Sequence, residues 1–456
     1  MSEYTDLKEF LSVNFMEVIF QVILDFIKNC SNDDATPTMT ECTLHTLAWK
    51  SFKNGILTVT VGASAQFKNT LNNGTFFHYY NITMHGDVVN RLSDLCVDGV
   101  EEVSEESLQK ETVLSLFGLP NITSAQLEDR AEELYARLCA DVKITDENRY
   151  CFPVIGIKEK YQMKLWPADL PDNCFGRLYL KASTATIYNP LHMDYPYENE
   201  PIPPRTILLN RKYYMNRLIP DDVITTAHEF VHFALHQVYF IILQLLENEF
   251  ESINCTSEPM LLDDNISVKE KAYFYAEWQA NELAIRIAMP KHLVNEAIAE
   301  YENSHSNLLH DGNFYENMLR NLALDFNVPF VTMKRRLRQL GYDYADGTFV
   351  IVDGEYVQPF SFAHGSLKEN ETFVIDRVHY ERMLHEDSYF AELIESMKYI
   401  YIGFAVCVFD AKYIRLINSN EGLQVVLTDY AREHMNECCL KFKYAHKGIS
   451  KNPCTK

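Results

Sequence analysis

The segment His228-Glu229-Phe230-Val231-His232 constrains this chain more than any other feature. In a helix, positions 228 and 232 are i and i+4, so both imidazoles project from one face and can share a tetrahedral metal ion. Glu229 directly follows the first histidine, where its carboxylate can take a proton from a water molecule that the metal has made more acidic. The spacing therefore predicts a metal site with a carboxylate beside it.

The surroundings of this motif favour the same interpretation. The neighbouring residues are apolar on nearly every side, which predicts a buried helix. Buried ionisable groups need partners, yet the sequence has no Lys or Arg between Arg217 and Lys269. No cation from the neighbouring sequence is available to neutralise Glu229. A bound divalent ion would satisfy both imidazoles and give the carboxylate a role.

A second predicted helix offers the further protein ligand that a hydrolytic site needs, with one position left open for water. Glu277, Ala280, Asn281 and Ala284 fall at i, i+3, i+4 and i+7, on one stripe of this helix. The alanines allow close approach to the first helix. We expect Glu277 to bind the ion and Asn281 to hydrogen-bond a ligand. Glu282 is the alternative ligand.

Composition bounds the class of protein. The chain has 456 residues, with 41 Lys and Arg against 64 Asp and Glu, giving a formal net charge of -23. Such a charge repels nucleic acid and anionic lipid, which argues against both as partners. The opening MSEYTDLKEF lacks a secretory pattern, and the apolar runs at 238–246 and 399–409 are too short to span a membrane. A cytoplasmic chain with eleven reduced cysteines is expected.

The order of patterns predicts an α+β chain of three domains. Residues 1–120 combine an apolar helix from Phe10 to Ile27 with strand-like runs, and residues 346–456 return to strands. The middle part, 121–345, holds a helix at 124–139, strands at 177–183, 184–189 and 205–210, helices at 221–236 and 271–290, and a helical group that ends at Gly341. Because of its prolines, the segment 189–204 is predicted to be an irregular loop.

Residues 125–345 also resemble a known family. HEFVHFALH followed by EWQANELAIRIAMP is similar to the ImmA/IrrE family of zinc metallopeptidases, and the likeness extends upstream through FPVIGIKEKYQMKLWPADLP and FGRLYLKASTATIYN and downstream to VTMKRRLRQLGY. The resemblance implies a gluzincin-like core, here flanked by two mixed domains. It implies one zinc ion held by His228, His232 and Glu277, with Glu229 as the catalytic carboxylate. Because relatives cleave or inactivate transcriptional repressors, it also implies a regulatory protein as substrate.

Two departures from the family pattern concern the cleft. Val231 stands where the family commonly has Gly, which narrows the space beside the metal. The 45 residues from His232 to Glu277 include an acidic insertion around Leu245–Asp264. The shape of the cleft and the substrate therefore do not follow from the resemblance.

Three other polar residues near the motif are expected to have structural roles rather than to bind metal. His236 lies one more turn along the helix face and is expected to pack or hydrogen-bond nearby rather than bind metal. Tyr273 and Tyr275 are expected to pack in the core. The alternative is that one of them donates a hydrogen bond to the developing oxyanion.

Two further clusters of reactive or charged residues lie far from the motif in sequence. Cys438 and Cys439, four residues after His434, are predicted to be buried free thiols rather than a second metal site, because adjacent cysteines seldom both bind one ion well. A basic run is expected to be a solvated helix face or a substrate-docking patch rather than a DNA-binding element. It consists of Lys334, Arg335, Arg336 and Arg338.

Two function classes follow from this sequence. The first is a zinc-dependent endopeptidase that cleaves a regulatory protein such as a transcriptional repressor, with Glu229 as general base. In a variant of this hypothesis, the terminal domains control access to the site and cleavage depends on a signal. The second is a DNA- or protein-binding regulator in which zinc is structural. Structural zinc usually has four protein ligands, commonly including cysteine, and Cys255 is the cysteine that would have to fold back.

Overall fold

The computed structural model contains two compact units. It describes residues 4–30, 38–68, 74–88, 90–108, 111–190, 192–214, 221–247, 252–256, 266–306, 311–368, 370–419 and 422–443. Unit 1 comprises Met1–Arg130, Lys158–Tyr214 and Thr225–Ala284, and unit 2 comprises Ala131–Ile157, Met215–Ile224 and Ile285–Lys456. Helices and strands occur throughout, which confirms the mixed α and β character. The three predicted domains stay a prediction.

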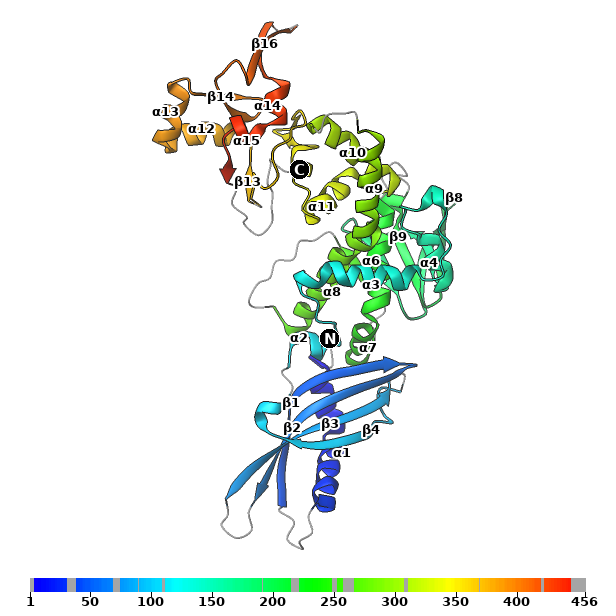
Figure 1. Cartoon of the computed structure of the whole chain (residues 1–456). Helices are drawn as coiled ribbons and strands as arrows, with labels where there is room; N and C mark the ends of the chain where they lie inside the picture. The colour runs from blue at the N-terminus through cyan, green and yellow to red at the C-terminus, as the bar shows by residue number, and fades with distance from the viewer. Residues whose placement is uncertain are drawn as a thin grey trace. The chain divides into compact units, whose positions relative to one another are not determined.

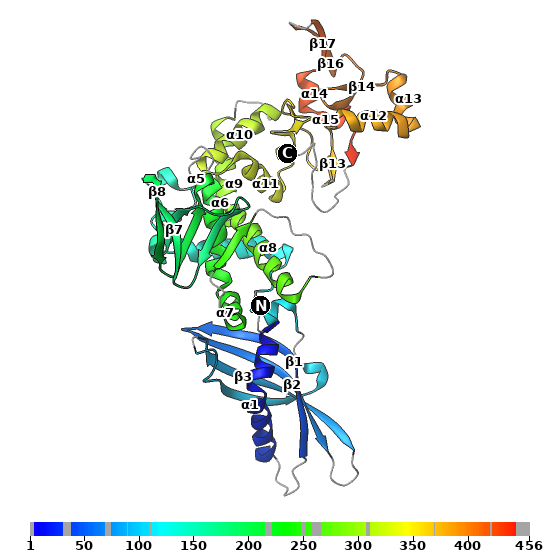
Figure 2. The same cartoon turned by 180° about the vertical axis from the view of Figure 1, so that it is seen from behind.

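Unit 1 begins with a helix packed on an antiparallel sheet of strand order β1-β2-β3-β4. Helix α1 (Leu7–Cys30) runs along one face of this sheet and buries an apolar stripe there (Figures 1 and 2). Asn54 and Gly55 join β1 to β2 with positive φ angles of 53° and 85°, as a tight hairpin turn requires. The strands are β1 (Thr38–Lys53), β2 (Ile56–Lys68), β3 (Thr75–Asp87) and β4 (Cys96–Val103).

The second sheet of unit 1 is six-stranded, in the order β10-β6-β9-β5-β7-β8. Strands β5 and β9 run parallel, and the other neighbours are antiparallel. The short helix α2 (Val113–Leu116) precedes this sheet in the chain, and α5 (Arg211–Tyr214) follows β9. The strands are β5 (Lys164–Ala168), β6 (Cys174–Tyr179), β7 (Ser183–Asn189), β8 (His192–Ile202), β9 (Thr206–Asn210) and β10 (Ser252–Thr256).

Strand β8 corrects the prediction that residues 189–204 form an irregular loop. Its proline residues Pro196 and Pro201 pair with Tyr188 and Thr184 of β7. Proline is tolerated because β8 is the last strand of the sheet, where one row of backbone groups needs no partner strand.

Two helices carry the predicted metal motif and its partner stripe, and a third follows the first after a bend. Helix α6 (Asp221–Leu235) contains the histidines, α7 (Gln237–Leu246) leaves it at an angle of 72°, and α8 (Val268–Ala288) contains Glu277. His236 lies between α6 and α7 with a non-helical backbone, so the helix turns directly after the motif. The helices predicted at 221–236 and 271–290 are thus confirmed.

Unit 2 joins a helical part to small two-stranded sheets. Its helices are α4 (Val154–Lys160, which runs on into unit 1), α9 (Lys291–Ser304), α10 (Gly312–Asp325), α11 (Phe330–Gln339), α12 (Arg377–Glu386), α13 (Ser388–Glu395), α14 (Asp429–Glu433) and α15 (Met435–Cys438). Most of α3 (Leu127–Cys139) also belongs to it. The strand pairs are β11 (Ile351–Val352) with β12 (Glu355–Tyr356), β13 (Glu371–Thr372) with β18 (Phe442–Lys443), β14 (Tyr399–Ile402) with β15 (Ala405–Val408), and β16 (Ile414–Ser419) with β17 (Gly422–Leu427).

The basic run on α11 is divided: Arg335 and Arg338 are exposed, as a solvated face predicts, whereas Lys334 and Arg336 are buried. Arg336 is fully buried and its Nε donates to the Met289 carbonyl at 2.8 Å. Lys334 is also buried and donates to the Thr348 carbonyl. Both cations therefore tie elements of unit 2 together, and burial lowers the pKa of Lys334 to about 8.

Helix α1 is long and apolar enough to cross a membrane by length and composition, and the bent pair α6 and α7 passes the same test when counted as one span. Helix α1 lies outside the two apolar runs, 238–246 and 399–409, that the sequence analysis considered as membrane spans. The location of the protein stays a prediction.

Candidate metal centre

His228, His232 and Glu277 lie together in the interior of unit 1. Helical spacing places the two histidines one turn apart on α6, and α8 brings Glu277 against them. One donor atom from each residue lies within 4.8 Å of the other two. The three side chains are at most 6% exposed. Burial of three polar side chains at one point is costly unless a partner satisfies them.

The distances between donor atoms match those around a tetrahedral ion. The two Nε2 atoms are 3.0 Å apart, and the Glu277 oxygens lie 3.5 Å from His228 Nε2 and 3.2 Å from His232 Nε2. Ligands about 2.1 Å from a tetrahedral zinc ion would be about 3.4 Å from one another. The donor set of two imidazoles and a carboxylate is also one that zinc accepts. The residues present therefore fit a zinc ion.

The other ring nitrogens are occupied in ways that leave both Nε2 atoms facing the centre. Nδ1 of His228 lies 3.1 Å from the amide oxygen of Asn281, as predicted for a residue that orients a ligand. Nδ1 of His232 lies 2.9 Å from Nδ1 of His236. His236 Nε2 in turn lies 3.0 Å from the Gln279 amide oxygen. His236 is thus a hydrogen-bonding neighbour, as the sequence analysis expected.

Glu229 is fully buried beside this cluster, and neither of its carboxylate oxygens has a hydrogen-bond partner among the residues that the structure describes. Burial raises the pKa of Glu229 well above its usual value, and the nearby Glu277 carboxylate adds to that rise. An ionised Glu229 would need a nearby cation or hydrogen-bond donor. Among the described side chains, none donates a hydrogen bond to it.

The pKa of Glu277 is shifted in the opposite direction. Burial alone would raise its pKa, but its contacts with His228 and His232 outweigh burial and lower the pKa to about 2. Burial also lowers the pKa of His232. The pKa values of the two carboxylates are thus shifted in opposite directions.

Strand β6 contributes two residues that the sequence did not single out. A Cβ on Gly176 would lie 2.9 Å from Glu229 Oε1 and 2.7 Å from Thr225 Cγ2, so a glycine leaves the room that the carboxylate occupies. The neighbouring Arg177 is the cation whose charge favours an ionised Glu229. The sequence near Glu229 offers no Lys or Arg, and the fold supplies this cation from strand β6 instead.

The remaining candidates lie outside this cluster. Glu282 does not join the group of donor atoms among the described residues, and Tyr275 is 45% exposed rather than packed in the core. Val231 is fully buried. Cys255 lies on β10, and its backbone pairs with that of Gly176, while its side chain is outside the described residues.

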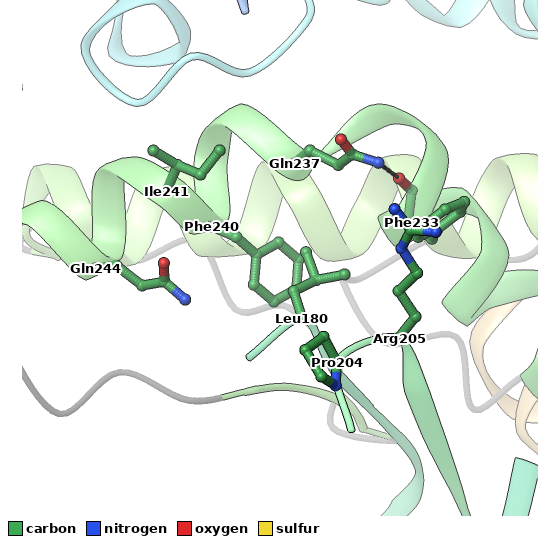
Figure 3. Close-up of a pocket in the computed structure, with 8 residues that line it drawn as sticks. All are labelled: Leu180, Pro204, Arg205, Phe233, Gln237, Phe240, Ile241 and Gln244. Atoms are coloured by element: carbon green, nitrogen blue, oxygen red, sulfur yellow. Dashed lines mark hydrogen bonds between the residues drawn. The ribbon is translucent and has the colours of Figure 1, made fainter. Parts of the chain in front are cut away.

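A cavity of about 270 Å³ lies along the corner between α6 and α7 (Figure 3). Phe233 and Phe240 form its apolar wall, and the Arg205 guanidinium lies 5.9 Å from the centre of the Phe233 ring. The Phe240 ring also packs edge-on against His232, with centroids 6.4 Å apart. The cavity therefore shares one wall with the cluster of donor atoms. Its other lining residues are Leu180, Pro204, Gln237, Ile241 and Gln244.

No family model, curated protein or solved structure matches this chain.

Proposed function

We propose that this protein is a zinc-dependent endopeptidase of the ImmA/IrrE type, with a gluzincin-like core. The observation that carries the proposal is the pair of Nε2 atoms 3.0 Å apart, with Glu277 beside them and the unpartnered Glu229 carboxylate next to the same cluster. A zinc ion held by His228, His232 and Glu277 would supply a Lewis acid that polarises a carbonyl and acidifies water.

In this proposal each protein group has a distinct part. Glu229 accepts the proton of the attacking water and later delivers it to the leaving amine, for which its raised pKa is suited. Arg177 favours the ionised form of Glu229 that begins the cycle. Asn281 and His236 hold the two imidazoles in the orientation that keeps Nε2 toward the ion.

A regulatory protein, such as a transcriptional repressor, is the substrate that we propose from the resemblance of residues 125–345. The test compares the protein termini of cells that carry the native protein with those of cells that carry Glu229→Gln. The expected result is a new terminus in one protein that depends on Glu229. Equal termini in the two strains, under conditions in which purified native protein cleaves a peptide library, would refute the choice of substrate.

The second candidate function is a regulator with structural zinc, and the pairing of β10 with β6 favours it. Because Cys255 and Gly176 are backbone partners and Gly176 adjoins Glu229, the chain brings a cysteine to the strand beside the cluster. Substitution Cys255→Ser separates the two functions. Unchanged zinc content and cleavage support the peptidase, whereas loss of zinc together with unfolding supports a four-ligand structural site.

A further inference from the structure

A second group of metal-type donors lies in unit 2, away from the histidine cluster in sequence and chemistry. Cys407 is on β15, Cys438 ends α15, and Cys439 follows it. The three Sγ atoms all lie within 4.8 Å of one another. An isolated antiparallel bridge pairs Cys407 with Cys439, and Leu440 N donates to the Val406 carbonyl at 2.9 Å. The backbone therefore fixes the position of this sulfur cluster.

The spacing of the sulfurs suits a shared ion. Cys438 Sγ and Cys439 Sγ are 3.7 Å apart, whereas a disulfide requires about 2.05 Å. Thiolates about 2.3 Å from a tetrahedral ion lie about 3.8 Å from one another. The thioether of Met435 is 3.6 Å from Cys439 Sγ, at the edge of the same cluster. Both separations match neighbouring corners of a metal coordination polyhedron.

The surroundings of the three cysteines favour metal ions that prefer sulfur ligands. The three cysteines are at most 9% exposed and belong to an apolar core cluster with Phe373 and Met435. His434 is turned aside, since its Nδ1 lies 2.9 Å from the Tyr430 carbonyl and its ring stacks on Tyr430. Among the residues that the structure describes, no imidazole or carboxylate joins the three sulfurs. Thiolate and thioether donors favour thiophilic ions over hard cations.

We propose that Cys407, Cys438 and Cys439 bind a thiophilic metal ion of the Zn²⁺, Cd²⁺ and Cu⁺ class. The ion would link β15 to α15 in a region whose described strands form only two-stranded sheets, which are marginal on their own. Its role is therefore structural, and it is independent of the endopeptidase proposal. The expectation that Cys438 and Cys439 are buried free thiols rested on this pair and His434, because Cys407 precedes Cys438 by 31 residues and no local spacing connects them.

The test is a Cd²⁺ titration of the reduced full-length protein, since thiolate-to-cadmium charge transfer absorbs in the ultraviolet and the histidine and carboxylate site does not produce it. We expect one thiolate-bound ion per chain in the native protein and in His232→Ala. Cys407→Ser and Cys438→Ser should lose the band. Cys151→Ser, a thiol of the same unit that donates to the Asp325 carbonyl, should keep it.

A second measurement covers the case in which the serine variants do not fold. Alkylation of the native protein, mapped by mass spectrometry, should label Cys407, Cys438 and Cys439 slowly with Cd²⁺ bound and at least tenfold faster after chelation. Equal labelling rates, a band that survives in folded Cys407→Ser, or a disulfide between Cys438 and Cys439 in protein isolated without oxygen would overturn the proposal.

Discussion

Replacing Glu229 by Gln should separate metal binding from catalysis. Glu229 lies outside the three donors, so the variant should keep zinc with native affinity while cleavage falls by several orders of magnitude. Glu277→Gln replaces the charged carboxylate by a neutral amide, which is a weaker zinc ligand, so zinc binding should weaken by on the order of 100-fold. Both are compared in a Cys407→Ser background, which removes the thiolate cluster from the measurement.

The stabilisation of the folded protein by zinc follows from the ratio of free zinc to its dissociation constant. Free zinc at 100 times its dissociation constant stabilises a folded protein by about 2.7 kcal/mol, whereas a 100-fold weaker site gains only about 0.4 kcal/mol. For a unit of this size, 1 kcal/mol shifts Tm by roughly 2–4 °C. Zinc should therefore raise Tm by about 5–10 °C in the Cys407→Ser protein and in its Glu229→Gln derivative, and by less than about 2 °C in its Glu277→Gln derivative.

Three assays decide this prediction: thermal unfolding with and without zinc, zinc content by mass spectrometry, and cleavage of a proteome-derived peptide library. Glu282→Gln is the matched control, because it changes a neighbouring carboxylate on the same helix that is outside the cluster. Loss of zinc from Glu229→Gln, or full cleavage by that variant, would refute the division of roles. Native zinc affinity in Glu277→Gln would refute Glu277 as a ligand.

Three further predictions concern the neighbours of the site and the buried lysine. Asn281→Ala, which removes an exposed side chain hydrogen-bonded to His228, should lower zinc affinity by roughly 10–100-fold in a competition titration, and unchanged affinity would contradict its orienting role. Gly176→Ala should displace the Glu229 carboxylate, so cleavage should fall at least tenfold while zinc content stays native; native cleavage would show that the carboxylate does not need this space. The pKa of Lys334 is about 8 in the folded protein and 10.5 at its ordinary value. Between pH 8 and pH 10.5 the unfolded chain therefore binds more protons than the folded one, and the free energy of unfolding rises with pH in this range. Lys334→Met should remove up to about 3 kcal/mol of that rise, measured as denaturant midpoints at pH 7 and pH 10, and an unchanged slope would contradict the assignment.

The parts of the site that the sequence predicted are those set by helical periodicity. His228 and His232 share a face because they are one turn apart, and Glu277 and Asn281 share a stripe for the same reason. The end of α8 is set locally as well, because Pro290 follows it closely. Local spacing alone carries this information.

Only the tertiary structure decided the rest, because those contacts join residues far apart in the chain. Gly176 and Arg177 lie on β6 and come close to Glu229 of α6 through long-range packing, which no local pattern near position 229 reveals. Strand β8 forms despite its prolines because it lies at a sheet edge, a position that the fold assigns. Cys407 joins Cys438 and Cys439 through one backbone bridge. Helical spacing is a property of neighbouring residues, whereas sheet order and long-range packing depend on the path of the whole chain.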